Sequence, residues 1–220
     1  MADRWATFDC YGTLVDWNTG IRGELERLFG VEPAERLLRR YHELEPEVQA
    51  ASPGSSYRTV LTVTLERLAE ETGLTLPEGE TGALAHSLPT WPVFEDVAPA
   101  LQDARERGWK LAILSNTDRD LLDASMAAIG VPFDDSIVAG EIGSYKPAER
   151  HWQVFRERVS GDAVHVHVAQ SIFHDVEPAS RLGIPCVWIN RLGEPADPRP
   201  ARTLASLAGL ARTLDELATG

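Results

Sequence analysis

The amino-acid sequence predicts an α/β fold in which a doubly wound parallel sheet carries a separate block of helices. From about residue 99 onward, short apolar segments alternate with amphipathic ones, as they do where parallel strands are joined by helices. Between residues 16 and 94, apolar residues instead recur at three- and four-residue spacing, which is typical of helices. We therefore expect a Rossmann-like core formed by residues 1–15 and 95–220. The helices of residues 16–94 would form a cap inserted after the first strand.

The expected elements follow one another along the chain. Trp5, Ala6 and Phe8 form an apolar lead that predicts a buried first strand. In the cap, helical periodicity covers residues 24–29, 34–44 and 57–71, with helix breakers at residues 52–54 and 77–79. In the core, the expected helices cover residues 98–106, 120–129, 147–158 and 177–182, and the expected strands cover residues 110–114, 136–139, 165–168 and 185–189.

Composition narrows the classes of partner. The chain has 220 residues, of which 43% are hydrophobic and 25% charged, as in an ordinary globular protein. Its formal net charge of −13 argues against nucleic acid and anionic membranes as partners, because both require basic surfaces. The N-terminus lacks a signal-peptide pattern and no apolar run reaches membrane-spanning length, so we expect a cytoplasmic protein. Cys10 and Cys186 lie in strand-like runs and are expected to be buried thiols.

Asp9 follows the first strand directly and precedes a Gly12-Thr13 turn. This placement puts a carboxylate at the carboxyl edge of the sheet, where open α/β sheets hold their ligands. A carboxylate there can act as a nucleophile that forms and then loses a covalent ester. Taken alone, the same aspartate could merely cap a turn.

Polar residues also follow three later strands. Ser115 and Asn116 can donate hydrogen bonds to an anion, although they could instead cap the next helix. Lys146 precedes a proline that starts a helix; a cation about 4 Å from Asp9 would stabilise the ionised carboxylate by about 4 kcal/mol at an effective dielectric constant of about 20. A lysine considered by itself is more often a solvated surface charge. Asp175 brings a second carboxylate to the same edge, unless its loop is a solvent-facing turn.

Four motifs occur in an order that resembles the haloacid dehalogenase superfamily, namely Asp9-Cys10-Tyr11-Gly12-Thr13, Ser115-Asn116, Lys146-Pro147 and a fourth loop that ends in Asp175. The resemblance covers nearly the whole chain, including the position of the helical cap. It implies a hydrolase whose nucleophile is an aspartate.

Two positions favour one branch of this superfamily. Its phosphatases generally carry a second aspartate two residues after the nucleophile and an acidic residue that opens the fourth loop at the magnesium site. The corresponding residues here are Tyr11 and Gln170. A halide leaves as a stable anion and needs no added proton, and Asp-x-Tyr-Gly-Thr resembles the type II, L-2-haloacid dehalogenases. The resemblance implies carbon–halogen cleavage in a small anionic substrate without metal or cofactor. A magnesium-dependent phosphatase and a non-catalytic binding member of the fold remain as alternatives.

The resemblance also implies a role for each site residue. Asp9 would attack the halogen-bearing carbon and form an ester, which water would hydrolyse to a 2-hydroxy acid of inverted configuration. Lys146, Thr13 and Ser115 would orient Asp9, while Asp175 would position or activate water. The expected substrate contacts are Tyr11, Trp17, Arg40, Asn116 and Gln170.

Arg40 receives its role from the segment Arg40-Tyr41-His42-Glu43-Leu44-Glu45, which resembles the family's Arg-x-x-x-Leu-Glu helix. It would polarise the halide, unless it is an ordinary charge on a helix face. Three residues depart from the family pattern: Gln170 and Ile172 stand where a serine and an asparagine are usual, and Trp152 stands where a tyrosine is usual. Homodimers are common in the family, so a homodimer is possible here.

Overall fold

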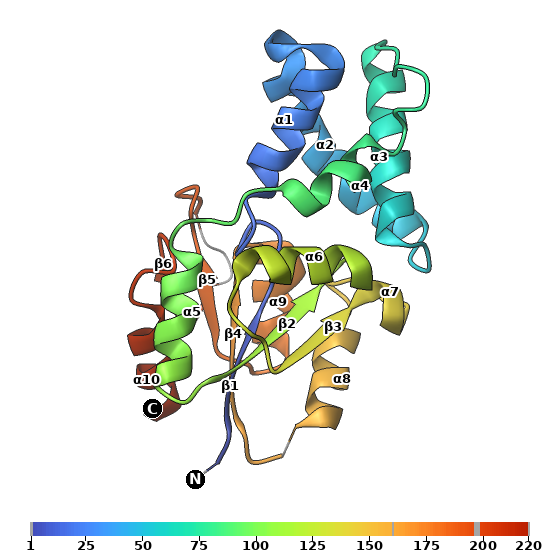
Figure 1. Cartoon of the computed structure of the whole chain (residues 1–220). Helices are drawn as coiled ribbons and strands as arrows, with labels where there is room; N and C mark the ends of the chain where they lie inside the picture. Colours follow the sequence, from blue (N-terminus) through green and yellow to red (C-terminus); the bar gives the residue numbers. More distant parts are fainter. Residues whose placement is uncertain (1, 160, 196–198, 220) are drawn as a thin grey trace.

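The computed structural model describes residues 2–159, 161–195 and 199–219. Its centre is a sheet of six parallel strands in the order β3-β2-β1-β4-β5-β6 (Figure 1). The strands are β1 (Arg4–Phe8), β2 (Lys110–Ser115), β3 (Asp135–Val138), β4 (Val164–Ala169), β5 (Cys186–Ile189) and β6 (Arg202–Leu204). The strand order reverses at β1, which pairs with β2 on one side and β4 on the other. This topology confirms the predicted α/β fold and creates a crevice at the carboxyl ends of these strands.

Helices precede and connect the later strands. The helical block after β1 contains α1 (Trp17–Phe29), α2 (Val31–Ala51), α3 (Tyr57–Thr72), α4 (Ala83–Ser87) and the 3₁₀ turn η1 (Leu88–Thr90). The remaining helices are α5 (Val97–Glu106), α6 (Arg119–Ile129), α7 (Ala139–Ile142), α8 (Arg150–Arg158), the π-helical turn η2 (Ile172–Val176), α9 (Glu177–Arg181) and α10 (Leu210–Thr219). Each element expected from the sequence has a counterpart here. The elements that the sequence analysis did not expect are the strand β6, the helices α4, α7 and α10, and the turns η1 and η2.

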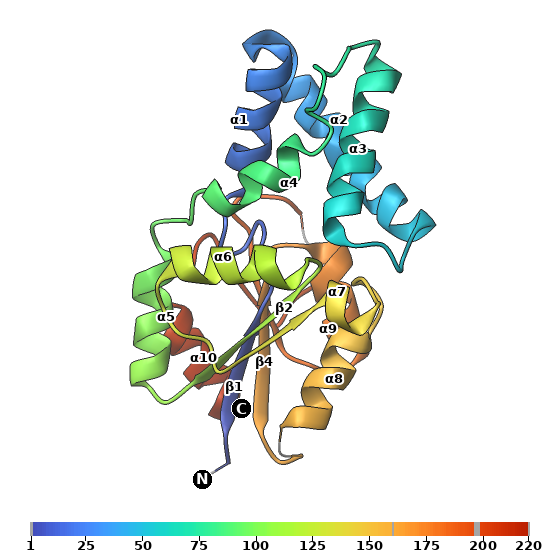
Figure 2. The ribbon, with the colours of Figure 1, turned by 45° about the vertical axis from the view of Figure 1, so that its right-hand side comes forward.

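The two faces of the sheet pack against different helices (Figures 1 and 2). Because side chains alternate along a strand, Ala6 and Phe8 of β1 face the hydrophobic cluster that includes α5, α6 and α10. Trp5 faces the opposite cluster, with Trp152 and Phe155 of α8. Burying a side chain such as Phe8 contributes roughly 1.5–3 kcal/mol. Both faces of the central strands are therefore covered, as a parallel sheet requires.

The helical block stands over the carboxyl edge of the sheet (Figure 1). The chain enters and leaves the block side by side, because the Asp16 amide donates to the Pro92 carbonyl at 2.7 Å and the Phe94 amide donates to the Leu14 carbonyl at 3.1 Å. The start of α3 is tied to the core, since both carboxylate oxygens of Asp118 accept backbone amides of Tyr57 and Arg58 at 3.0 Å. The block thus roofs the crevice where the strand order reverses.

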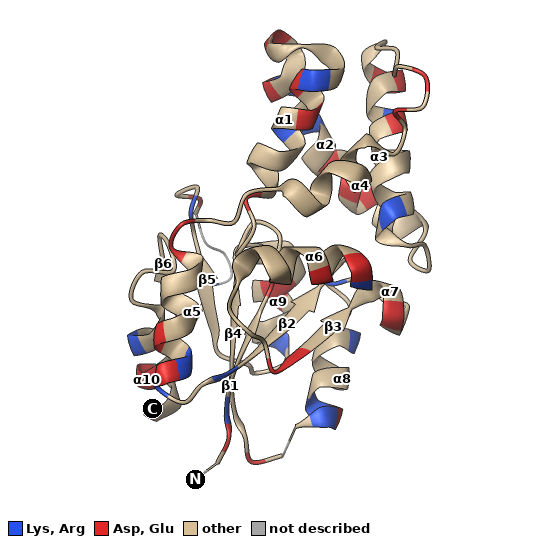
Figure 3. Cartoon of the chain, viewed as in Figure 1, with Lys and Arg blue, Asp and Glu red and all other residues tan. Residues whose placement is uncertain are grey.

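Charged residues are dispersed over the fold. Figure 3 shows Lys and Arg residues alternating with the more numerous Asp and Glu residues along the helices. Many of them form exposed ion pairs such as Arg67 with Glu47 at 3.0 Å. Within the described part of the chain, no helix combines the length and apolar character needed to cross a membrane.

Candidate active site

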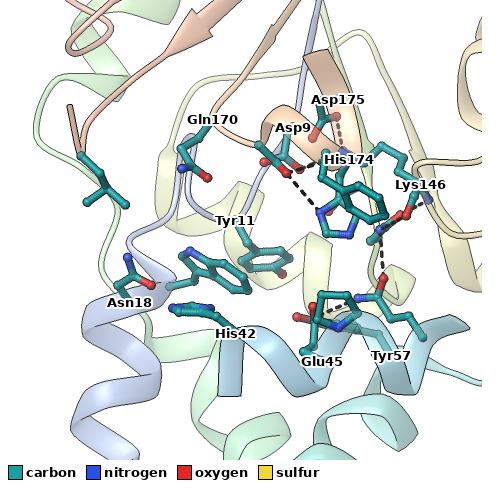
Figure 4. Close-up of a pocket in the computed structure, with 18 of the residues that line it drawn as sticks. Asp9, Tyr11, Asn18, His42, Glu45, Tyr57, Lys146, Gln170, His174 and Asp175 are labelled. Atoms are coloured by element: carbon teal, nitrogen blue, oxygen red, sulfur yellow. Dashed lines mark hydrogen bonds and ion pairs between the residues drawn. The ribbon is translucent and has the colours of Figure 1, made fainter. Parts of the chain in front are cut away.

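A cavity of about 450 Å³ lies between the helical block and the carboxyl edge of the sheet. Its core wall comes from the segments that follow β1, β2, α7, β4 and β5, and its opposite wall comes from α1, α2 and the start of α3. Figure 4 shows the side chains of both walls pointing toward one another. The site residues expected from the sequence can therefore be placed one by one.

The turn after β1 presents Asp9 to this cavity. The amides of Leu14 and Val15 both donate to the Cys10 carbonyl, at 2.7 and 3.0 Å, and close a tight loop. Gly12 has a φ of 91° in this loop, a backbone conformation that favours glycine. The loop directs the Thr13 hydroxyl to Oδ2 of Asp9 at 2.8 Å, while the Gln170 amide donates to Thr13 Oγ1 at 2.9 Å. One oxygen of the carboxylate is thereby fixed from two neighbouring strand ends.

Lys146 bridges two carboxylates at the floor of the cavity. Its Nζ donates to Oδ1 of Asp9 at 2.9 Å and to Oδ1 of Asp175 at 2.6 Å, and its side chain is 1% exposed (Figure 4). Burial opposes the charge on Lys146, but the two carboxylates outweigh it and raise the pKa of the ammonium. The three predicted residues Asp9, Lys146 and Asp175 therefore form one buried ionic cluster.

The two carboxylates of this cluster differ in their proton affinity. Burial raises the pKa of Asp9 and the Asp175 charge adds to this rise, whereas Lys146 and Thr13 oppose it. For Asp175 burial acts in the same direction, but Lys146 and His167 prevail and hold its pKa well below the usual range. Asp175 is thus the firmly ionised member of the pair.

Tyr11 lies two residues beyond Asp9 and lines the cavity. Its hydroxyl is 3.1 Å from Ser125 Oγ, and its ring stacks with Tyr57 at a centroid distance of 6.3 Å. Burial raises the pKa of this phenol well above its ordinary value of 10.0. A phenol this weakly acidic is a poor proton donor and acceptor for a leaving group near neutral pH.

Ser115 and Asn116, at the end of β2, also line the cavity. Asn116 is fixed by Lys146, because its Oδ1 accepts the Lys146 amide at 2.6 Å and its Nδ2 donates to the Lys146 carbonyl at 3.0 Å. The buried Ser115 hydroxyl makes no hydrogen bond within the described residues, so the expected contact by which it would orient Asp9 is not made here. The hydroxyl is left able to donate to a bound anion. Trp17 and Gln170 line the cavity as expected.

The cap wall contains polar residues that the sequence analysis did not select. Glu45 is 3% exposed, and its Oε1 accepts Nε2 of Gln49 at 2.6 Å. Burial raises the pKa of Glu45 from 4.5 to about 7, even though hydrogen bonds from Tyr57 and Gln49 oppose the shift. Gln49 also reaches across to the core, where its Oε1 accepts Asn116 Nδ2 at 3.3 Å. Beside them, His42 packs on Trp17 at a ring distance of 4.7 Å.

Arg40 requires a correction. The structure places it outside the cavity wall, with its guanidinium paired to Glu43 and Glu71 at 2.8 Å on the outer face of the helical block. Its predicted contact with a halide is therefore wrong for this structure. The cavity-facing residue of that turn of α2 is His42, whose pKa burial lowers to about 4, so this position carries no positive charge at neutral pH.

Ile172 and Trp152, two of the residues that depart from the family pattern, lie on the α8 side of the sheet. Ile172 begins η2 and packs against the cluster on the α8 side of the sheet. Trp152 is fully buried there, with its ring 5.4 Å from that of His167. Cys10 and Cys186 are free and buried, which confirms the expectation of buried thiols.

Comparison with known proteins places this arrangement in a family. A model of the haloacid dehalogenase-like hydrolases matches residues 4–169, which is most of the chain. The chain belongs to this family.

Relatives of this hydrolase include two (S)-2-haloacid dehalogenases. The one from Pseudomonas sp. (strain YL) is 28% identical, with 84% of this chain and 82% of the relative covered. The one from Burkholderia cepacia, number 4A, is 26% identical and covers 97% of this chain and 93% of its own. The L-2-haloacid dehalogenase of Xanthobacter autotrophicus, solved with chloropropionic acid covalently bound, superposes with a TM-score of 0.83 at 20% identity over 97% of this chain and 98% of its own. This last similarity shows a shared fold.

The residues of this hydrolase do not suit a divalent metal ion. Within the part of the chain that the structure describes, no cluster of three His, Cys, Asp or Glu side chains is arranged to hold a metal. Lys146 occupies Oδ1 of both Asp9 and Asp175, and Gln170 offers an amide in place of a third carboxylate. Magnesium favours several oxygen ligands, with carboxylates prominent among them, so we derive no step through it.

Proposed function

We propose that this hydrolase cleaves the carbon–halogen bond of small 2-haloalkanoic acids through an aspartyl ester at Asp9, giving a halide and a 2-hydroxy acid. The observation that carries the proposal is the pairing of a buried carboxylate, Asp9, with a high-pKa phenol, Tyr11, at the place where an acid would otherwise assist the leaving group. The names of its (S)-2-haloacid dehalogenase relatives support the same reaction.

The first step is a displacement at carbon. An oxygen of the Asp9 carboxylate forms a bond to C2 of the substrate while the carbon–halogen bond breaks, and the halide departs with the bonding electrons. Lys146 and Thr13 hold the carboxylate in position at 2.9 and 2.8 Å. Because the halide leaves as an anion, no proton has to be supplied and Tyr11 can serve as a neutral wall.

The second step is hydrolysis of the ester. Water attacks the carboxyl carbon of Asp9 and gives a proton to Oδ2 of Asp175, which has no hydrogen-bond partner within the described residues. Because Lys146 and His167 hold the pKa of Asp175 low, this carboxylate is a weak base that keeps the proton only briefly. The bond between that carbon and the substrate oxygen then breaks, and the departing alkoxide takes the proton and becomes the 2-hydroxy acid. Asp9 is left as a carboxyl group that loses its proton to solvent.

An anionic substrate must bind here without a cation from the cap. Lys146 is the single Lys or Arg among the described residues that line the cavity, and two carboxylates already neutralise it. Binding would therefore rely on hydrogen-bond donors, namely the free Ser115 hydroxyl, the Asn18 and Gln170 amides and a protonated Glu45. A cytoplasmic location and a homodimer remain parts of this proposal, as does the exclusion of nucleic acid and membrane as partners.

The test is halide release from chloroacetate, fluoroacetate and each enantiomer of 2-chloropropionate, with and without EDTA. We expect release that EDTA does not change. Phosphomonoester hydrolysis that requires added Mg²⁺, with no halide release, would instead establish the phosphatase. In a single turnover in heavy-oxygen water the 2-hydroxy acid should stay unlabelled, because its new oxygen comes from Asp9; label in that product would refute the ester route.

A further inference from the structure

A chain of buried hydrogen bonds leads from the active site into the sheet. Thr7 Oγ1 lies 2.8 Å from Nε2 of His165 and 2.8 Å from Nδ1 of His167. Nε2 of His167 lies 2.9 Å from Oδ1 of Asp175, the same oxygen that accepts Lys146. Thr7 of β1 and His167 of β4 are direct partners in the sheet, so the register of two parallel strands sets the first links.

The geometry fixes the proton between His167 and Asp175, and a neutral His167 ring would fix the others. Asp175 is ionised and can only accept, so Nε2 of His167 must donate to it. In a neutral imidazole the other nitrogen, Nδ1, then accepts, and the Thr7 hydroxyl is the donor that lies against it. Having one proton to give, that hydroxyl must accept from Nε2 of His165. Burial lowers the pKa of His165 to about 3, so the His165 ring is neutral near pH 7.

The two carboxylate oxygens of Asp175 have different hydrogen-bond partners. Oδ1 accepts both Lys146, at 2.6 Å, and His167, at 2.9 Å. Oδ2 is buried and has no hydrogen-bond partner within the described residues, although Asp175 lines the cavity. The carboxylate cannot rotate without exchanging two charge-assisted hydrogen bonds, so Oδ2 remains the oxygen that is free to take a proton.

Aromatic rings of α8 hold both imidazoles in place. Trp152 meets His167 edge to face at 5.4 Å, and Phe155 meets His165 at 4.7 Å. Trp152, which stands where the family usually has a tyrosine, therefore packs against His167. The rings restrict the imidazoles to the orientation that the hydrogen bonds require.

We propose that His167 is a positioning residue for ester hydrolysis, fixed in its Nε2–H tautomer by Thr7, and that it keeps Oδ2 of Asp175 directed to the attacking water. The inference rests on the proposed function, because hydrolysis of the Asp9 ester is the step that it serves. Alkylation of Asp9 involves no proton transfer, so it does not depend on this chain.

The experiment separates the two steps in Thr7→Val, which removes the hydroxyl and nearly keeps the shape. With 2-chloropropionate, we expect a burst of about one chloride per site and an Asp9 ester detectable by intact-protein mass spectrometry. Steady-state turnover should fall about 10- to 100-fold, which is part of the roughly 10²–10⁴-fold that general acid–base catalysis contributes. Thr7→Ser restores the donor and should restore turnover. Equal loss of both steps without ester accumulation, or turnover unchanged from the unaltered enzyme, would overturn the inference.

A second pair of variants tests His167 itself, should the β1 substitution disturb folding. His167→Gln keeps an N–H donor near Asp175, whereas His167→Leu removes it. We expect the ester to accumulate more in the leucine variant than in the glutamine variant. Equal accumulation in the two would count against a positioning role.

A spectroscopic measurement is independent of activity. The imidazole ¹⁵N chemical shifts of His167 should report the Nε2–H tautomer in the unaltered protein and a changed tautomer population in Thr7→Val. An Nδ1–H tautomer in the unaltered protein would refute the inference. If the unaltered protein releases no halide, the proposed function is wrong and the role of His167 in hydrolysis is wrong with it. If the protein releases halide but His167 lacks the expected tautomer, only the inference about His167 is wrong.

Discussion

The two walls of the cavity are built on different principles. On the core side, Asp9, Lys146 and Asp175 are ionic groups at the carboxyl edge of the sheet, joined by contacts of 2.9 and 2.6 Å. On the cap side, Glu45 and its neighbours form a hydrogen-bonded wall in which burial favours the neutral carboxyl. The comparison indicates that the reacting groups belong to the sheet edge, while the cap selects what reaches them.

The largest expected effect tests the core wall. Asp9→Asn keeps the size of the side chain but removes the nucleophilic carboxylate. Halide release should fall by roughly 10⁴-fold or more, as when a catalytic nucleophile is lost. Asp123→Asn, at an exposed position on α6, is the matched control and should leave the rate unchanged. Substantial release by the Asp9 variant would place the nucleophile elsewhere.

The next effect concerns stability. Lys146→Met leaves two buried carboxylates without their shared cation, so the free energy of unfolding should fall by about 3–5 kcal/mol in urea titrations. Lys110→Met is the matched control. It breaks an ion pair with Asp3 whose side chains are 44% and 46% exposed, and such a pair contributes less than about 1 kcal/mol. If the two variants lost similar unfolding free energy, the buried ion pairs of Lys146 would be no more stabilising than the exposed pair of Lys110.

A smaller effect belongs to the cap wall and depends on pH. Glu45 has a pKa of about 7 in the folded protein against 4.5 ordinarily, so folding favours its protonated form. Its contribution is fully present below pH 4.5 and is lost as the pH rises through 7. The total is about 3 kcal/mol, at about 1.4 kcal/mol per pKa unit.

Glu45→Gln should remove this contribution to the pH dependence. The difference in unfolding free energy between variant and unaltered protein should change between pH 5 and 8 in the variant's favour. The KM for an anionic haloacid should likewise rise above pH 7 in the unaltered enzyme and stay flatter in the variant, because ionised Glu45 repels the substrate. Parallel profiles for the two proteins would argue against a titrating Glu45.

The smallest expected effect is at Arg40. Because its ion pairs with Glu43 and Glu71 lie on the outer face, at 2.8 Å, Arg40→Ala should leave halide release within about twofold and change the stability little. His42→Ala, on the cavity-facing side of α2, should raise the KM more. A large loss of activity confined to Arg40→Ala would restore the role that the motif predicted.

The sequence was informative at the strand ends and less so in the cap. Asp9 and Gln170 each follow a strand directly and Ser115 ends one, and parallel strands bring their carboxyl ends to one edge whatever the packing details. Arg40 was misplaced because motif spacing ignores helical phase. His42, two residues later, lies about 200° around the helix, and the buried stripe containing Tyr41 and Leu44 sets which side faces inward.

Other features depend on contacts that the sequence does not display. Glu45 and Gln49, spaced by four residues beside the apolar stripe of α2, were the available signal for a polar cap wall. The contact between Thr7 and His167 could not be read from the sequence, because the two residues lie 160 positions apart and meet only through strand order. Elements of three to five residues, such as β6 and α4, are too short to show a period.

Asp118, a residue of the core, stabilises the first turn of helix α3 in the helical block. A helix begins with amides that have no partner within the helix, and for α3 the first two of these are satisfied by a carboxylate from the core, 60 and 61 residues away. Swinging the block outward would strip both amides of that acceptor and fray the first turn of α3, which carries Tyr57. Admission of a substrate and integrity of that helix end are therefore linked, and a tight-binding ligand should protect these two amides from hydrogen exchange.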